Sequence, residues 1–287
     1  EGAAALARKA DDIMSAPVST VPENALLYVA KGRMERLGFR HLAAADGSGR
    51  ITGVVSSRAL LRLRAGKALA LGDAVATAPD AAALKAVQDA LPALASALLA
   101  DEISALKIAG VISQVLRDTT ARAAELAEAE LAEAGWGGPP APYALLVLGS
   151  GGRGESLLAA DQDNAIVHAG GDGDDRWFAE LGKRVSDTLN AVGIPYCKGG
   201  VMASKPQFRH SAQGWREQIA RWLAHPDGQN LLNVDIFYDF RRALGDGGLA
   251  DELRRDALEA AARSPALLRM LAKNVEEAGS AIGYFGR

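Results

Sequence analysis

The sequence predicts a mixed α/β (α+β) protein, in which a small sheet packed against helices follows a helical linker and a separate N-terminal module. Three features of the sequence support this fold class. Residues 1–70 follow the order strand, helix, strand, strand, helix, and residues 71–140 carry apolar side chains at helical spacing. From residue 141 onward, apolar strands alternate with amphipathic helices. A chain of 287 residues is long enough for about two domains, each with a core of its own.

Local signals predict the elements of residues 1–70. A helix opens near Pro22 and places Leu26, Val29 and Met34 on its apolar face. Two short strands follow, HLAAAD and ITGVVS, and the Asp- and Gly-rich segment DGSGR between them is typical of a hairpin turn. The segment SRALLRLRA is predicted to form the closing helix.

Residues 71–140 are predicted to be helical, because apolar residues recur three and four positions apart. These residues are Leu91, Leu94, Leu98, Leu99, Ile103, Leu106, Ile108, Val111, Ile112 and Val115. The segment ARAAELAEAELAEAG continues the pattern to Gly135. The following WGGPPAP breaks any helix and marks a boundary.

The remainder of the chain is predicted to alternate between strands and helices. The predicted strands are YALLVLGS, NAIVHA, YCKGGVMAS and NVDIFYDF. The predicted helices are DDRWFAELGKRVSDTLNAVG, which closes at Gly193, then GWREQIARWLAHP, and the segment from about Gly248 onward with a break at Pro265. The predicted domains are an N-terminal module, a helical linker, a sheet-containing domain and a C-terminal helical part, at residues 1–70, 71–140, 141–247 and 248–287.

Composition excludes several classes of function. The 32 Lys and Arg residues against 35 Asp and Glu give a net charge of −3, which does not support a general nucleic-acid binder. The single cysteine, Cys197, excludes an internal disulfide framework and fits a reducing compartment such as the cytoplasm. No uncharged apolar run of about 18 residues occurs, so no membrane span is expected.

A glycine-rich turn follows the strand that begins at Tyr143. Gly149, Gly151 and Gly154 spell G-x-G-x-x-G, the pattern of dinucleotide-binding proteins. That class needs a full crossover helix and then an acidic residue at the end of the second strand. Here Asp161 follows the glycines too closely for such a helix and stands at the start of the next strand. A dinucleotide site is therefore not favoured.

Asp161 and Asp163 follow the glycine turn as an Asp-x-Asp pair. Residues two positions apart on a strand point to the same face, and two carboxylates placed in this way suit Mg²⁺. Gly149 permits close approach of the backbone to a triphosphate, and Ser150 can donate a hydrogen bond to a phosphate oxygen. The pattern predicts a nucleotidyl-transfer site, although an Asp-x-Asp pair alone is also an ordinary start of a strand.

Further residues could complete such a site. A two-metal mechanism calls for a third carboxylate on an adjacent strand. If NVDIFYDF is a strand, Asp235 and Asp239 lie on one face of it and both are candidates. Arg153 in the glycine turn, Lys198 beside two glycines, and Arg209 are candidates to neutralise phosphate charge.

The segment LGSGGRGESLLAADQDNAIV resembles the signature of the DUF294 nucleotidyltransferase family, relatives of the uridylyltransferase that modifies the PII signalling protein. Two later blocks, CKGGVMASKPQFRHSAQGWREQIARW and NVDIFYDFRRALGDGGLADELR, are similar to later blocks of that family. The resemblance spans roughly Leu91 to the C-terminus. It implies a polymerase-β-type nucleotidyltransferase domain followed by a helical substrate-binding part.

The resemblance also implies roles for individual residues. Gly149 and Ser150 would hold the triphosphate, and Asp161 and Asp163 would hold Mg²⁺ or Mn²⁺. The Asp-aromatic-Arg block of the family falls on residues 239–241, which favours Asp239 over Asp235 as third carboxylate. Two departures from the pattern put the substrate side in question: Lys205 stands where Asn is expected, and Phe208 where Trp is expected.

The N-terminal region resembles a CBS motif, a regulatory module that binds adenosine ligands and works in pairs. Gly53 to Ser56 match the G-h-h-[ST] part of its pattern, but Ala59 replaces the aspartate that usually binds ribose. Binding of an adenine nucleotide by this half and a purely structural or dimerising role both stay open.

Together these features predict an enzyme that transfers a nucleoside monophosphate from an NTP to a protein or small-molecule acceptor, in signal transduction. A regulatory protein acceptor, a homodimer, and no nucleic-acid or membrane partner are expected. The alternative is a nucleotide-sensing regulatory protein that binds an NTP without turnover.

Overall fold

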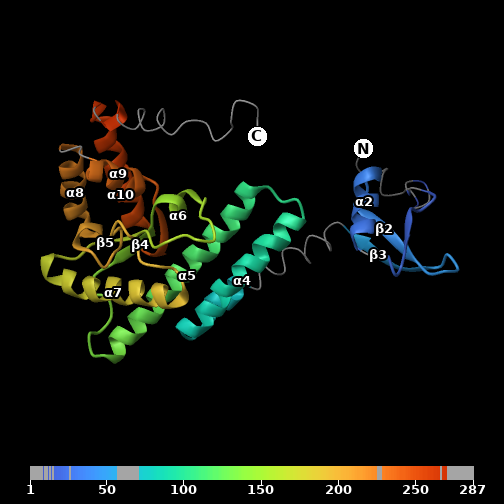
Figure 1. The fold of residues 1–287 in the computed structure, drawn as a ribbon, viewed down its shortest axis with the longest axis horizontal. Coiled ribbons are helices and arrows are strands. Elements are labelled where there is room, and N and C mark those ends of the chain that lie inside the picture. Colours follow the sequence, from blue (N-terminus) through green and yellow to red (C-terminus); the bar gives the residue numbers. More distant parts are fainter. Residues whose placement is uncertain are drawn as a thin grey trace. The chain divides into compact units, whose positions relative to one another are not determined.

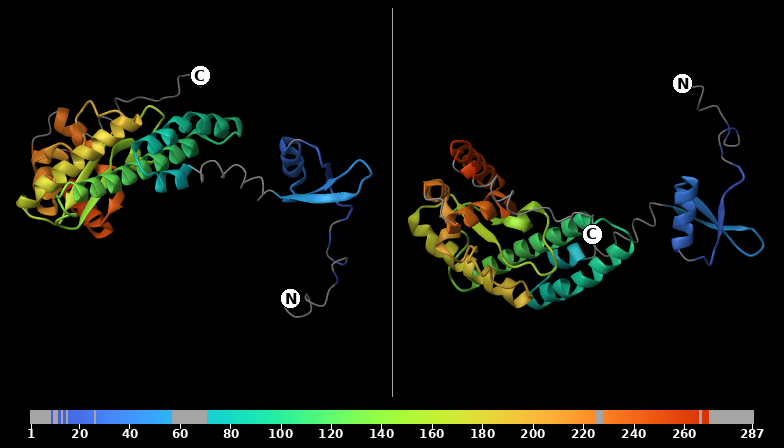
Figure 2. Two further views of the ribbon diagram at one scale, coloured as in Figure 1. Left: turned by 90° about the horizontal axis from the view of Figure 1, so that it is seen from below. Right: turned by 45° about the horizontal axis from the view of Figure 1, so that its top comes forward.

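The described part of the chain folds into two compact units, residues 1–69 and 70–287. The structure is a computed structural model, and the residues it describes are 9, 12, 14, 16–25, 27–56, 71–224, 228–265 and 267–269. Each unit has its own sheet (Figure 1), and two further views show the same elements (Figure 2). The inner boundaries of the predicted four-part division stay predictions.

The N-terminal unit contains a three-stranded sheet and a helix. Its elements are β1 (Thr20–Pro22), α2 (Leu27–Leu37), β2 (His41–Ala45) and β3 (Ile51–Ser56). β2 lies in the centre, parallel to β1 and antiparallel to β3. The predicted order of strand, helix, strand, strand is confirmed, and the predicted fifth element, which includes Ala59, lies outside the described residues.

The details of this unit follow from local chemistry. Asp46 fixes the predicted hairpin turn, since its carboxylate accepts hydrogen bonds from the backbone N–H groups of Ser48 and Arg50. The helix begins at Leu27, later than the predicted start at Pro22. Met34 is buried in a small core as predicted, whereas Val29 is exposed.

Two long helices, α4 (Ala81–Ala100) and α5 (Ala105–Glu133), form the predicted helical region. The carboxylate of Asp80 caps the first helix by accepting a hydrogen bond from the N–H of Ala83. α4 packs against α5 and against α7 (Asp175–Val192) through its apolar side.

Among the described residues, α4 is long and apolar enough to cross a membrane by length and composition, although no span was expected. This is weak evidence for a span, because core helices pass the same test. Leu84, Val87 and Leu91 of this helix are buried within the protein, which favours a packing role.

The C-terminal unit is built on a four-stranded sheet in the order β6-β5-β4-β7. The strands are β4 (Tyr143–Val147), β5 (Asn164–His168), β6 (Arg209–Ser211) and β7 (Arg241–Gly245). β4 is antiparallel to both β5 and β7, and β5 is parallel to β6. An antiparallel β4–β5 pair is incompatible with the parallel crossover unit of dinucleotide-binding folds, so that alternative is excluded.

Helices cover both faces of this sheet. α5 and α7 lie on one side, and α8 (Ala212–Ala224), α9 (Gly228–Tyr238) and α10 (Gly247–Ala262) lie on the other (Figure 1). The central strands β4 and β5 are buried along their whole length. The fold class predicted from the sequence, a mixed sheet with helices and a helical C-terminal part, is confirmed.

Two predicted strands are wrong. The segment YCKGGVMAS is a loop of tight turns, in which the N–H of Gly200 donates to the carbonyl of Cys197 and the N–H of Lys205 to that of Met202. The segment NVDIFYDF contains the end of helix α9, so Asp235 and Asp239 do not share the face of a strand.

The packing of α9 against α8 explains why NVDIFYDF is largely helical rather than a strand. Val234 and Phe237 stand three positions apart, and both are buried in the core beneath α8, where the ring of Phe237 stacks on Trp215 with centroids 4.6 Å apart. The segment therefore fits both periods, since Val234 and Phe237 satisfy the helical one while Val234, Ile236 and Tyr238 alternate, and the contact with α8 selects the helix.

Replacing Trp215 with alanine is expected to lower the free energy of unfolding by about 3–5 kcal/mol. The side chain is fully buried, and its Nε1 donates a 2.9 Å hydrogen bond to the carbonyl of Ile166. Urea denaturation measures the change. Leu258→Ala serves as control, because the Leu258 side chain is 57% exposed. Equal losses in the two variants would contradict the packing of α8 on the sheet.

Candidate active site

The glycine turn leaves β4 and forms the short helix α6 (Gly149–Arg153). The N–H of Leu148 donates a 2.9 Å hydrogen bond to the carbonyl of Asp163, which ties the turn to the start of β5. Gly149 has φ +51°, and a Cβ there would stand 3.3 Å from Oδ2 of Asp163. Glycine at this position therefore lets the backbone of the turn lie directly against the predicted carboxylate.

Glycine is required at Gly152, the neighbour of Gly151, for a different reason. A Cβ on Gly152 would lie 1.4 Å from the carbonyl oxygen of Asp239, because the chain entering β7 crosses directly over α6. Gly154 ends the helix in the left-handed conformation with φ +80°. Of the pattern glycines, Gly149 thus serves close approach to Asp163 and Gly154 ends the helix, whereas the backbone crossing requires Gly152, which the pattern does not include.

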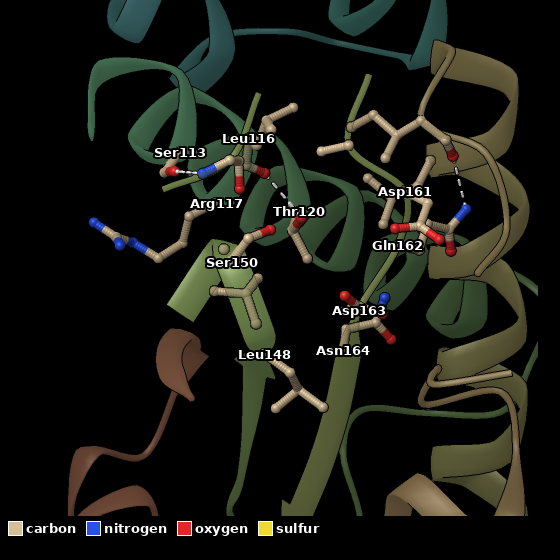
Figure 3. A pocket seen from close by; sticks show the side chains of 16 residues that line it. Ser113, Leu116, Arg117, Thr120, Leu148, Ser150, Asp161, Gln162, Asp163 and Asn164 are labelled. Atoms are coloured by element: carbon tan, nitrogen blue, oxygen red, sulfur yellow. Dashed lines mark hydrogen bonds between the residues drawn. The ribbon is translucent and has the colours of Figure 1, made fainter. Parts of the chain in front are cut away.

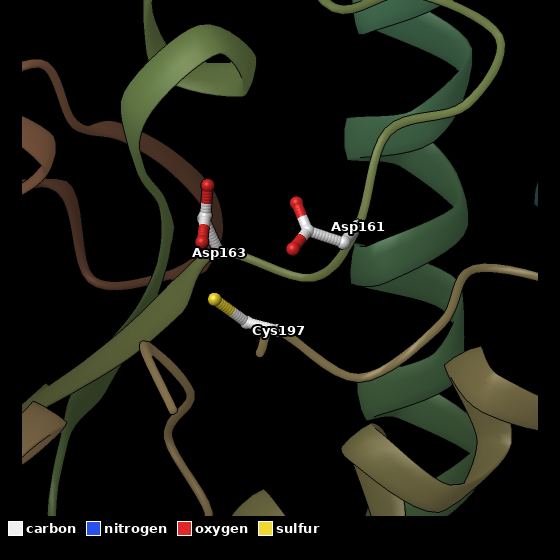
Figure 4. A group of neighbouring side chains, drawn as sticks. All are labelled: Asp161, Asp163 and Cys197. Atoms are coloured by element: carbon white, nitrogen blue, oxygen red, sulfur yellow. The ribbon is translucent and has the colours of Figure 1, made fainter. Parts of the chain in front are cut away.

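Asp161, Asp163 and Cys197 come together beside this turn. One ligand atom from each residue lies within 4.8 Å of those of the other two (Figure 4). Asp163 immediately precedes β5, and Cys197 stands in the loop after α7. The two carboxylates lie close together, as expected from their Asp-x-Asp spacing, although both lie in the loop before the strand rather than on it.

The two carboxylates are close together, and Asp163 is half-buried whereas Asp161 is exposed. Burial raises the pKa of Asp163 to about 6; the Cys197 thiol opposes this rise, and the negative charge of Asp161 adds to it. The Oδ1 atom of Asp163 is buried without a hydrogen-bond partner in the described structure. A buried lone pair next to a second carboxylate fits a hard divalent cation.

Cys197 is less suited to that ion. Burial raises the pKa of its thiol to about 11, so the sulfur is protonated at neutral pH in the absence of a metal. A neutral thiol is a poor ligand for Mg²⁺, which prefers oxygen. The donor set therefore fits Mg²⁺ or Mn²⁺ through the two aspartates.

A small pocket opens between the glycine turn and α5 (Figure 3). Ser150, Asp161 and Asp163 line it, together with Ser113 and Arg117 from α5. Its volume is about 40 Å³, which accommodates an ion with a few waters. A nucleotide bound to these residues would extend out of the pocket.

Sequence analysis missed the contribution of α5. The hydroxyl of Ser113 accepts a 2.7 Å hydrogen bond from the N–H of Ser156, and both residues are buried. Thr120 also lines the pocket. The available signal was weak: Ser113, Arg117 and Thr120 are polar residues that interrupt the apolar face of a long helix.

Two other predicted site residues, Arg153 and Asp239, are paired with one another. Arg153 donates from Nε to Glu155 at 2.9 Å and from Nη1 to Asp239 at 2.6 Å. Asp239 is therefore engaged by an arginine, and it is not a member of the cluster that the described acidic residues form with Cys197. Asp235 is exposed on α9. The choice of third carboxylate stays a prediction.

The other two predicted basic residues, Lys198 and Arg209, do not line the small pocket. Lys198 lines a second, larger cavity of about 840 Å³ along α7, which adjoins the first site at Cys197. Arg209 is buried, and its guanidinium binds the carboxylate of Asp175 at 2.7 Å and the carbonyl of Ala203 at 2.8 Å. All three nitrogens of the guanidinium thus donate to protein acceptors, which gives Arg209 a structural role.

A mixed sheet with a glycine turn after one strand and a carboxylate pair before its antiparallel neighbour defines a nucleotidyltransferase-type domain. Residues 89–229 match the family described as "Putative nucleotidyltransferase DUF294", and residues 10–66 match the CBS domain. Both resemblances inferred from the sequence are confirmed. The first match ends before Asp235 and Asp239. A search of curated proteins returned no match.

Proposed function

We propose that the protein is a nucleotidyltransferase that moves a nucleoside monophosphate from an NTP to an acceptor hydroxyl. The observation that carries this proposal is the convergence of Asp161 and Asp163 beside the glycine turn, where Asp163 lies directly against Gly149. The match to the DUF294 family over residues 89–229 supports the same reaction class.

Asp161 and Asp163 would hold Mg²⁺ or Mn²⁺, because their oxygens are close and one of them is buried without a partner. When bound, the ion neutralises charge on the phosphates of the NTP. Gly149 gives the triphosphate access to the backbone, and the hydroxyl of Ser150 donates to a phosphate oxygen. Lys198 supplies a positive charge from the adjoining cavity.

The reaction forms a bond between the acceptor oxygen and the α-phosphorus and breaks the bond from that phosphorus to the bridging oxygen of the β-phosphate. Pyrophosphate leaves, and the proton of the acceptor hydroxyl passes to a base. Asp239 would serve as third carboxylate or as base only after its ion pair with Arg153 opens. Asp235 is the alternative, from the neighbouring helix α9.

The acceptor belongs to one of two classes, a regulatory protein or a small molecule. The CBS domain would regulate transfer, either by binding an adenine nucleotide or by joining two copies of the chain in a homodimer. We also propose a role in signal transduction in the cytoplasm; the combination of the two domains and the single cysteine of the sequence support it.

One observation favours a second candidate function, that of a nucleotide sensor without turnover. The described site gathers two carboxylates, and the third candidate, Asp239, is held by Arg153. A site that keeps this arrangement with nucleotide bound could bind an NTP and lack the group that completes transfer.

Calorimetric titration of the protein with ATP, UTP, GTP and CTP tests the proposal, in Mg²⁺ and in EDTA. We expect at least one NTP to bind in Mg²⁺ and to lose its binding in EDTA, because the carboxylate pair repels phosphate without a cation. Absence of binding by all four NTPs would refute both candidate functions. Release of pyrophosphate from the bound NTP in the presence of acceptor separates the enzyme from the sensor.

A further inference from the structure

Two arginines lie beside the glycine turn. Arg117 comes from α5 and lines the small pocket next to Ser150. Its side chain extends past Ser150, away from Asp161 (Figure 3). Arg241 is the first residue of β7, and its two terminal nitrogens lie 3.8 and 3.9 Å from the place that a Cβ on Gly154 would take.

These two arginines are brought together by long-range packing. α5, α6 and β7 contact one another in pairs, so residues from three distant parts of the chain surround one turn. Burial and the neighbouring positive charge of Arg241 both lower the pKa of Arg117. The two positive charges therefore face the same region of the turn and repel one another.

Neither arginine makes an ion pair among the described residues, although the negative charge of Asp118 acts on Arg117 and partly offsets the lowering of its pKa. Arg117 donates from Nη2 to the amide oxygen of Gln114, and Arg241 makes no ion pair there. Arg153, in the same turn, differs from them because it binds the carboxylates of Glu155 and Asp239. Two guanidinium groups without an ion pair at one turn form a local excess of positive charge, which an anion would relieve.

We propose that Arg117 and Arg241 bind the β- and γ-phosphates of the NTP, the part that leaves as pyrophosphate. This inference rests on the proposed function, because it orients the triphosphate across Ser150 from the carboxylate pair to the arginines. Guanidinium groups suit this role, since they donate paired hydrogen bonds to phosphate oxygens. Arg153 differs from both, because its Nε and Nη1 already donate to Glu155 and Asp239 in this structure.

Titration with inorganic tripolyphosphate and with ATP, both in Mg²⁺, tests this assignment. Tripolyphosphate removes any dependence on the base. Arg117→Gln and Arg241→Gln are each expected to weaken binding of both probes by about tenfold or more, since each loses charge-assisted hydrogen bonds. Arg117→Lys retains the positive charge but lacks the paired N–H donors of the planar guanidinium. We therefore expect its affinity for both probes to lie between those of the wild type and Arg117→Gln.

Arg242→Gln is the matched control. Arg242 neighbours Arg241 on β7, so its side chain points to the other face of the strand, where Nη1 donates to the carbonyl of Gly245 at 2.8 Å. This variant removes the same charge and is expected to bind tripolyphosphate like the wild type. An equal loss of affinity in Arg242→Gln would show a general charge effect and overturn the assignment.

Three further outcomes bear on the proposal. It is overturned if the wild type binds no tripolyphosphate, or if Arg117→Gln and Arg241→Gln bind it as tightly as the wild type does. It stands if both variants bind weakly while loss of Asp161 and Asp163 leaves metal-dependent NTP binding unchanged. In that case the phosphate site is correct, and the proposed role of the carboxylate pair fails.

Discussion

The double variant Asp161→Asn/Asp163→Asn is expected to lose metal-dependent NTP binding and transfer. Asparagine keeps the shape of each side chain and removes both negative charges that face the glycine turn. Loss of groups that merely support metal ligands costs about 10–100-fold in metal affinity, so loss of both ligands is expected to cost more than about 100-fold. Calorimetric titration with the NTP that the wild type binds measures the effect.

The variant is not expected to lose stability. Burial raises the pKa of Asp163 from 3.8 to about 6. Its ionisation therefore costs folding free energy, by an amount that is absent below pH 3.8 and grows as the pH rises to about 6. Asparagine does not ionise, so at pH 7 the variant should unfold at the same or a higher urea concentration than the wild type.

Asp89→Asn provides the control for charge alone. Asp89 is exposed on α4, where it pairs with Lys85 at 2.8 Å, and its loss should leave NTP binding unchanged. If the double variant binds Mg²⁺ and NTP as the wild type does, the carboxylate pair is not the metal site. The cavity along α7 that contains Lys198 would then be the next candidate for the nucleotide site.

The parts of the site that could be predicted are those encoded by neighbouring residues. Gly149, Ser150, Asp161 and Asp163 lie within a short stretch, and the order of turn and carboxylates can be interpreted without knowledge of the tertiary structure. The hairpin at Asp46 and the helix end at Gly193 are predictable for the same reason, because each depends on the local conformation of the backbone.

The parts that could not be predicted depend on packing between distant segments. Ser113 meets Ser156 only because α5 lies against the glycine turn, and no local pattern encodes that contact. Arg153 was expected at a phosphate, and its ion pair with Asp239 joins residues far apart in the chain. In α9, apolar residues that fit two periods became helical through contact with Trp215.

Gly152→Ala is expected to destabilise the fold severely, by more than about 3 kcal/mol. The new Cβ would lie 1.4 Å from the carbonyl oxygen of Asp239 and 2.5 Å from its carbonyl carbon. Both atoms belong to the backbone at the entrance to β7, so no rotation of a side chain can relieve the overlap. Urea denaturation measures the loss, and NTP binding should fall with it because α6 would shift.

Gly151→Ala separates this overlap from the general effect of a substitution in α6. A Cβ on Gly151 would meet Val147 at 3.7 Å and Ser156 at 3.8 Å, which are ordinary contacts. The neighbouring variant should therefore retain nearly all of the wild-type stability. If Gly152→Ala proved equally stable, the chain could not cross α6 at Asp239, and the ion pair that holds Asp239 away from the carboxylate pair would lose its structural basis.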